Sequence, residues 1–174
     1  MKWQKIYNEK EEIKIFDKIT EIADLLIDNN LNEISFFGGR AGIVLFKVYC
    51  SRFFLIERYY ESAIDDIQII FDDLNKSNPY YSYSSGLAGI GWLMEFLQQN
   101  NLLNCDTNDI IGDIDHYLYI SMISELNKGN YDYLHSAGGI ALYFLKRMKK
   151  LPKAKEYLYE FIDVLDEIKY SRRK

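Results

Sequence analysis

Two kinds of helical segment alternate along this chain. In the first kind, apolar residues recur at spacings of three and four, which predicts an amphipathic helix with one buried face. These segments are 11–27, 59–74, 109–126 and a last one that runs to about residue 168, with Pro152 in its first turn. In the second kind, apolar residues lie on nearly all sides, which predicts burial of most of the helix surface. These segments open at glycine-rich stretches and are 36–50, 83–97 and 134–145.

The seven main helices predicted in this way form repeats. The glycine-rich stretches carry three related motifs, 47 and then 50 residues apart: Gly39-Arg-Ala-Gly42-Ile, Gly86-Leu-Ala-Gly89-Ile and Ser136-Ala-Gly138-Gly139-Ile. A glycine costs a helix about 0.5–1 kcal/mol relative to alanine, so its recurrence indicates close approach of backbones or unusual dihedral angles at the helix entrance. Each repeat is an amphipathic helix, a polar loop and an apolar helix, and the final helix begins a fourth repeat.

This order of helices suits a ring of helical hairpins. Small residues in the first turn allow neighbouring apolar helices to converge as an inner layer, and the amphipathic helices then form an outer wall. The N-termini of the inner helices gather at one end of the ring, with their unpaired N–H groups and partial positive charge. We expect an all-α fold with a single domain over residues 1–174, although a generic helical solenoid also accounts for the pattern.

Composition narrows the class of protein. A chain of 174 residues that is 48% hydrophobic and 27% charged can bury a real core, and its two prolines favour long helices. The net charge of -5 argues against a nucleic-acid partner, which requires a basic surface. The N-terminus lacks the apolar region of a signal peptide, and no run reaches the ~18 apolar residues of a membrane span. Cys50 and Cys105 are expected to be reduced thiols in a cytoplasmic protein.

The chain resembles the lanthionine synthetase C family in its three glycine motifs. The similar segments are FFGGRAGIVLF (36–46), YSSGLAGIGWLMEFL (83–97) and YDYLHSAGGIALYFL (131–145). The resemblance implies an α/α toroid of helical hairpins, in which a Gly-x-x-Gly loop introduces each inner helix. It extends over essentially the whole chain, which corresponds to about the first half of the family's usual length. Three and a half hairpins, about half of a ring, are therefore expected.

The resemblance also implies a chemistry, the addition of a cysteine thiol to a dehydrated serine or threonine, which closes a thioether ring in a precursor peptide. In the family a zinc ion, held by two cysteines and a histidine in the second half of the toroid, lowers the pKa of the thiol. Those ligand motifs are absent here, and neither Cys50 nor Cys105 has the glycine or histidine neighbours that they require. We therefore expect no zinc in this chain, a catalytically incomplete cyclase half, and a peptide substrate or partner protein.

Two other functions fit the same pattern. A helical half-ring without a metal centre could serve as a non-enzymatic module that binds a peptide or a protein. A carbohydrate-active toroid would use paired carboxylates, but only Asp132 stands at the entrance of an inner helix. The zinc content of the purified chain separates the cyclase from the binding module.

Asp132 is the catalytic position that the resemblance carries over. Family members often have Tyr-Asp-x-x-x-Gly-x-x-Gly-Ile in the third repeat, with the aspartate facing the zinc centre, and residues 131–140 match this motif except at Ser136. That departure affects the expected backbone of the loop. Asp132 also suits a second role, because a carboxylate near a helix N-terminus stabilises the helix by about 0.3–1 kcal/mol. His135 could pair with Asp132 in catalysis or form only loop hydrogen bonds.

Other residues are candidates for substrate binding at the mouth of the ring. Arg40 could offer its charge to an anion or form a structural salt bridge. Five tyrosines that precede inner helices could contact a peptide or a sugar, or pack over the helices: Tyr80, Tyr81, Tyr83, Tyr131 and Tyr133. Asp113, Asp115 and His116 are residue types that bind metals, and Asp113 and His116 share a helix face, but no second cluster completes a tetrahedral site, so no metal ligands are assigned.

An open half-ring leaves two apolar flanks. The first flank is expected around Ile43 and Phe46. The second is expected on the third inner helix and the last helix: Ile140, Tyr143, Phe144, Tyr157, Phe161, Val164 and Leu165. Large exposed apolar patches usually mark an interface. The sequence therefore predicts a homodimer that covers like flanks with like, or a chain that continues and covers them itself.

Overall fold

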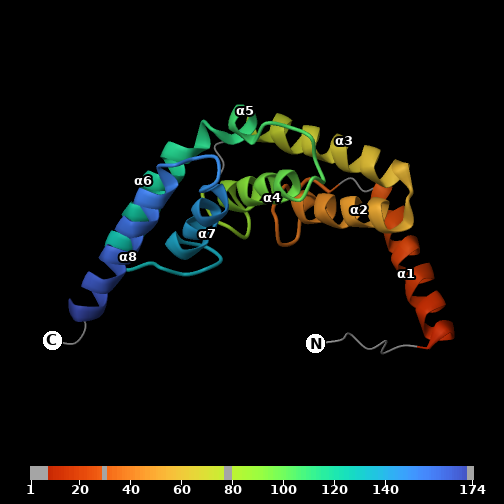
Figure 1. Ribbon diagram of the computed structural model, residues 1–174, viewed down its shortest axis with the longest axis horizontal. Coiled ribbons are helices and arrows are strands. Elements are labelled where there is room, and N and C mark those ends of the chain that lie inside the picture. The colour runs from red at the N-terminus through yellow and green to blue at the C-terminus, as the bar shows by residue number, and fades with distance from the viewer. Residues whose placement is uncertain (1–7, 29–30, 77–79, 172–174) are drawn as a thin grey trace.

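The computed structural model describes residues 8–28, 31–76 and 80–171, and every regular element in these ranges is a helix (Figure 1). The helices are α1 (Glu9–Ile27), α2 (Arg40–Phe54), α3 (Glu57–Leu74), α4 (Leu87–Gln99), α5 (Thr107–Ile111), α6 (Ile114–Asn127), α7 (Ala137–Arg147) and α8 (Ala154–Ser171). The predicted all-α fold is confirmed, and six of the seven predicted segments are single helices.

The helices form two layers that curve into an arc (Figure 1). The glycine-started helices α2, α4 and α7 make the inner layer, and the amphipathic helices lie outside them. Along the arc α2 packs on α3, α4 packs on α7, and α7 packs on both α6 and α8. α1 stands at one end of the arc and α8 at the other, as expected for part of a ring.

The predicted difference in burial between the layers is clearest for α4 and α3, whereas the inner helix α2 at the end of the arc leaves Tyr49 and Phe53 exposed. Nine of the 13 residues of α4 are buried, which leaves little of this inner helix exposed. The outer helix α3 buries one face, made of residues at spacings of four, three and four: Tyr59, Ala63, Asp66 and Ile70. None of the described helices is both long enough and apolar enough to cross a membrane.

Two predicted helix boundaries are wrong. The outer helix expected over 109–126 is divided into α5 and α6 at Gly112 and Asp113. α5 packs against α4, whereas α6 packs mainly against α7 and α8, and the outer layer changes direction between them where the arc bends (Figure 1). Pro152 lies in the turn before α8 and not in its first turn; the carbonyl of Pro152 accepts a hydrogen bond from the N–H of Lys155 at 3.3 Å.

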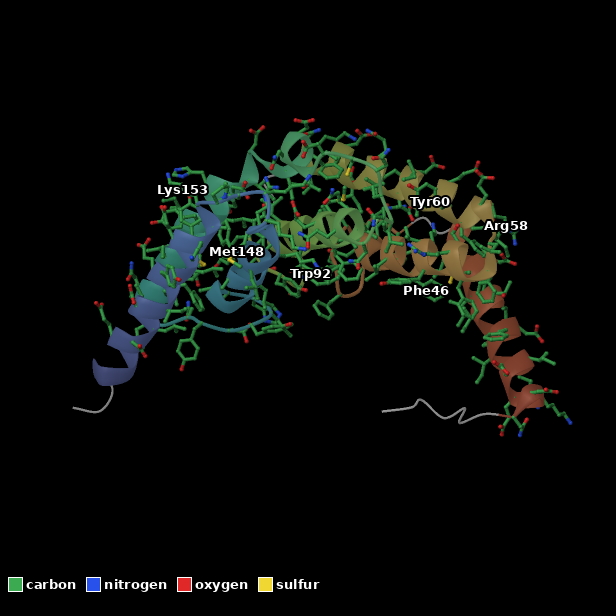
Figure 2. The ribbon with its side chains drawn as sticks, in the orientation of Figure 1. Phe46, Arg58, Tyr60, Trp92, Met148 and Lys153 are labelled. Carbon is green, nitrogen blue, oxygen red and sulfur yellow. The ribbon has the colours of Figure 1, made fainter. Side chains whose placement is uncertain are left out.

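The ends of the arc expose other residues than those predicted. Ile140, Tyr143 and Phe144 are fully buried, because α7 packs against α4, α6 and α8. The predicted members on the last helix are half-buried against the same core: Tyr157, Phe161, Val164 and Leu165. The large apolar side chains exposed at this end are Leu145, Met148, Tyr159 and Ile162. At the other end Ile43 and Phe46 are half-buried, and Phe46 lies where α2 meets α1 (Figure 2).

Candidate functional site

The loops before the three inner helices lie side by side and are joined by backbone hydrogen bonds. Phe36 and Phe37 in the first loop donate their N–H groups to the carbonyl oxygen of Ser84 in the second loop, both at 3.0 Å. Tyr83 and Ser84 in turn donate to the carbonyl oxygen of Leu134 in the third loop, at 3.1 and 2.9 Å. The donors and acceptors occupy equivalent positions in successive repeats. We call this series of bonds the loop ladder.

The second glycine of the motif permits each loop to fold back onto its own helix. A Cβ on Gly89 would overlap the carbonyl oxygen of Tyr83, six residues earlier, and Gly139 has the same relation to Tyr133. A Cβ on Gly89 would also lie 3.0 Å from the Cβ of Phe36 in the preceding loop, and one on Gly139 would lie 2.5 Å from the Cβ of Tyr83. Glycine at this position therefore allows close contact both within a repeat and between repeats.

The third loop enters its helix with the same backbone geometry as the first two, although Ser136 replaces the first glycine of the motif. Gly39, Gly86 and Ser136 are the N-caps of α2, α4 and α7, with similar extended φ angles of -126°, -134° and -140°. A Cβ on Gly86 would overlap the carbonyl oxygen of Tyr80, six residues earlier. The equivalent carbonyl in the third loop, that of Asn130, instead accepts a hydrogen bond from the Ser136 hydroxyl at 2.9 Å. The third loop therefore accommodates a side chain where the second loop does not.

One aromatic ring from each loop lies along the loop ladder. Phe36, Tyr83 and Tyr133 occupy equivalent positions, and neighbouring ring centroids are 5.7 and 5.8 Å apart. Trp92 of α4 packs on Phe36 and Tyr83 from the concave side of the arc (Figure 2). Tyr83 is 4% exposed and Tyr133 is 54% exposed, so the row runs from the core to the surface. Burial raises the pKa of Tyr83 to about 12, so its hydroxyl is protonated at neutral pH.

An open pocket of about 490 Å³ lies beside the third loop, and we call it the third-loop pocket. Its lining comes from the second and third loops and the end of α6: Tyr80, Glu125, Gly129, Asn130, Tyr131, Asp132, His135 and Ser136. The rings of Tyr80 and Tyr81 lie against each other at a tilt of 32°, with centroids 4.1 Å apart, and their hydroxyls are 2.8 Å apart. The structure thus brings four of the residues predicted from the sequence into one pocket: Tyr80, Tyr131, Asp132 and His135.

Asp132 and His135 form a hydrogen-bonded pair at this pocket. The Oδ1 atom of Asp132 lies 3.0 Å from Nδ1 of His135 and accepts the backbone N–H groups of Leu134 and His135 at 2.9 and 2.6 Å. The backbone N–H of His135, with smaller effects from its side chain and from Leu134, holds the pKa of Asp132 below its usual value. Asp132 is therefore ionised at neutral pH, and it both shapes the loop and orients the imidazole of His135.

Glu125 is buried and anchors the third loop. Its carboxylate accepts hydrogen bonds from Lys128 Nζ at 2.7 Å, from Asn130 Nδ2 at 2.9 Å and from Ser136 Oγ at 3.2 Å. Hydrogen bonds from Lys128, then Asn130 and Tyr81, lower the pKa of Glu125 to about 2, against the opposing effect of burial. A carboxylate that is held ionised by several donors suits a structural role better than proton transfer at neutral pH.

Arg40, Tyr83 and Tyr133, which were also predicted to bind substrate, do not line the third-loop pocket. Arg40 is buried, forms an ion pair with Asp66 of α3, and donates to the carbonyl oxygen of Leu31. Lys47 contacts the other carboxylate oxygen of Asp66 at 2.7 Å. Of the two roles that the sequence leaves open for Arg40, this geometry favours the structural salt bridge.

A buried charged cluster at the junction of α4, α6 and α7 was not predicted from the sequence. Arg147 pairs with Glu95 at 2.8 Å and with Asp115 at 3.0 Å, and all three side chains are buried. The hydroxyl of Tyr143 also donates to Asp115. Asp115 is thus part of the core and not of a metal site with His116. A local signal was Glu95, a charged residue within the otherwise apolar segment 83–97, whereas Arg147 lies beyond the segment predicted to end at residue 145.

Comparison with protein families places these features in a known context. The sequence matches the family model for lanthionine synthetase C-like protein over residues 1–119 and again over residues 30–174, which together cover the chain. The chain belongs to this family. Two overlapping matches are in keeping with a LanC-like chain built from repeats. No curated protein matches the sequence.

The residues of this LanC-like chain do not fit the zinc ion that the resemblance implies for the family. Among the residues that the structure describes, no three His, Cys, Asp or Glu side chains converge to hold a metal ion. Cys50 is buried and Cys105 is half-buried, and neither forms a disulfide. Burial raises the pKa of both thiols, whereas a thiolate ligand requires a lowered pKa.

Proposed function

We propose that this LanC-like chain binds a peptide in the third-loop pocket, as part of the machinery that adds a cysteine thiol to a dehydrated serine or threonine. The observation that supports this function is the Asp132–His135 pair in an open pocket lined by exposed tyrosines. Tyr80 and Tyr131 offer apolar ring faces for peptide side chains and hydroxyls for the peptide backbone.

The pair supplies a proton acceptor suited to a thiol. Because Asp132 holds Nδ1 of His135, Nε2 is the ring nitrogen available to accept a proton. Removal of the thiol proton gives a thiolate, whose sulfur bonds to the β-carbon of the dehydrated residue, and a proton then adds to the α-carbon. The carboxylate of Asp132 stabilises the protonated imidazole during this step.

A second candidate function is peptide recognition without catalysis. It is favoured by the raised pKa of both thiols and by the absence of a three-ligand metal cluster among the described residues. In either case we propose that this chain carries no zinc of its own. The unpaired thiols Cys50 and Cys105 suit a reducing, cytoplasmic environment.

A peptide that contains one cysteine and one dehydroalanine, with a fluorophore at its N-terminus, tests both functions. Binding is measured by fluorescence anisotropy, and ring closure by the loss of thiol alkylation, because closure leaves the mass of the peptide unchanged. We expect binding that weakens at least about tenfold in Tyr131→Ala, a loss of about 1.4 kcal/mol. Tyr117→Ala, an exposed tyrosine of α6 outside the pocket, is the matched control. Unchanged binding in Tyr131→Ala would refute the site; binding without thiol loss would favour recognition alone.

A further inference from the structure

The two junctions between neighbouring inner helices, α2 with α4 and α4 with α7, are built in the same way. In each, the forward face of one helix packs on the backward face of the next. At the forward face, which points to the next repeat, Val48 and Glu95 occupy equivalent positions and are 3% and 0% exposed. Glu95 bonds across the junction to Arg147 of α7. At the backward face, Leu93 joins the core cluster of α2, and the ring of Tyr143 lies against Gly91 of α4. Each internal junction therefore joins a forward face to a backward face.

The forward face of the third repeat is open. Leu145 occupies the position of Val48 and Glu95 but is 56% exposed. Tyr133, equivalent to the nearly buried Tyr83, is exposed as well. The N–H of Tyr133 makes no backbone hydrogen bond within the described part of the chain, whereas the equivalent N–H of Tyr83 donates to the next loop. The loop ladder thus ends here with a donor and an aromatic ring.

The backward face of the first repeat has the complementary features. The carbonyl oxygen of Phe37, equivalent to the acceptors in the second and third loops, accepts no backbone hydrogen bond within the described ranges. A Cβ on Gly42 would contact only its own loop at Phe36, without the aromatic ring of a preceding repeat. An apolar pocket of about 260 Å³ adjoins this face: Phe16, Ile19, Phe46, Tyr49, Cys50, Phe53 and Phe54.

We propose that the forward end of one copy docks on the backward end of a second copy, so that two arcs close a single ring. This inference rests on the likeness to the internal junctions. In each of them, one repeat supplies a donor N–H, an aromatic ring and a forward face. The next repeat supplies an acceptor carbonyl, a glycine and a backward face. Leu145 and Tyr133 then meet the apolar pocket and Gly42 of the other copy.

The shape of the arc allows this closure to occur twice. α1 and α8 both descend from the same, convex side of the arc toward its concave side (Figure 1). A half-turn of a second copy about the viewing axis places its α1 end against α8 and its α8 end against α1. The resulting two-fold ring has two identical head-to-tail contacts, in contrast to the like-with-like dimer predicted from the sequence.

Sedimentation equilibrium at tens of micromolar distinguishes these arrangements. We expect the wild-type chain to have twice the monomer mass, and Leu145→Asp and Phe53→Asp each to have the monomer mass, since either change alters both contacts of the ring. An equimolar mixture of the two variants should recover dimers, because one contact of the mixed ring joins two unaltered ends. A dimer that joins two forward ends, or two backward ends, would be lost in only one of the two variants. Mixing would not restore dimers of that variant.

Ile110→Asp controls for the charge introduced, because Ile110 of α5 is exposed as well, at 36%, and α5 lies at the crown of the arc, away from α1 and α8 (Figure 1). Its mass should equal that of the wild type, and circular dichroism should show unchanged helix content in all three variants. A monomeric wild type, variants that remain dimeric, or a mixture that stays monomeric would each overturn the head-to-tail ring.

Discussion

The second and third loops have the same entrance geometry and opposite environments. Both lead through an extended N-cap into an inner helix, and both place a tyrosine on the row of rings. Tyr83 of the second loop is enclosed between two neighbouring loops, whereas Tyr133 of the third loop has a neighbour on one side and stands in solvent on the other. The repeat sequence therefore specifies the backbone of a loop, and its place in the arc decides whether that loop is core or surface.

The two tyrosines provide the largest expected contrast. Tyr83→Ala should lower the free energy of unfolding by about 3–5 kcal/mol, because it removes a fully packed aromatic ring. In the monomeric Leu145→Asp background, Tyr133→Ala should change it by no more than about 0.5 kcal/mol, because the ring is exposed in the single chain. Urea unfolding followed by circular dichroism measures both values. Equal losses in the two variants would show that the loops are equally enclosed.

The exchange of glycine and serine at the N-cap tests the difference in loop backbone. Gly86→Ser should cost about 3 kcal/mol, because the new Cβ overlaps the backbone of the same loop at Tyr80. Gly38→Ser is the matched control, since a Cβ there would meet no atom within 4 Å. Its thermal midpoint should stay close to that of the wild type. Similar midpoints for Gly86→Ser and Gly38→Ser would contradict the close approach in the second loop.

The reverse exchange in the third loop should be milder. Ser136→Gly removes hydroxyl bonds to Asn130 and Glu125 but introduces no overlap, so we expect a loss of about 1 kcal/mol. Hydrogen exchange of the third-loop amides should increase while exchange in the second loop stays the same. A loss as large as that of Gly86→Ser would mean that both N-caps are equally constrained.

Glu125 gives the most pH-dependent effect. Its pKa in the folded chain is lowered from 4.5 to about 2, so the ionised carboxylate stabilises the fold above pH 4.5. That contribution is lost as the pH falls toward 2. The urea midpoint of wild type should therefore exceed that of Glu125→Gln at pH 7, and the gap should shrink progressively below pH 4.5. A gap that is constant between pH 7 and pH 3 would rule out this anchor.

Parts of the candidate site were predictable because they lie close together in the sequence. Asp132 and His135 belong to one loop of four consecutive residues, so local geometry alone can pair them. Tyr80 was a candidate because it precedes an inner helix, but its approach to the third loop was not predictable, since it comes from another loop. The contribution of Glu125 was not predictable either, because it comes from the end of an outer helix. The burial of Arg40 depended on Asp66 of α3, 26 residues away, which no local pattern specifies.

The sequence by itself determined the helices, the repeats and the family. Hydrophobic periodicity and glycine spacing are local properties, and they follow from which side chains each helix must bury and which backbones must approach closely. The tertiary structure decided the break between α5 and α6, the burial of Tyr143 and Phe144, and the faces left open at the ends of the arc. These features depend on the curvature of the stacked repeats, because equivalent residues such as Val48 and Leu145 differ in burial only through the neighbours that the arc gives them.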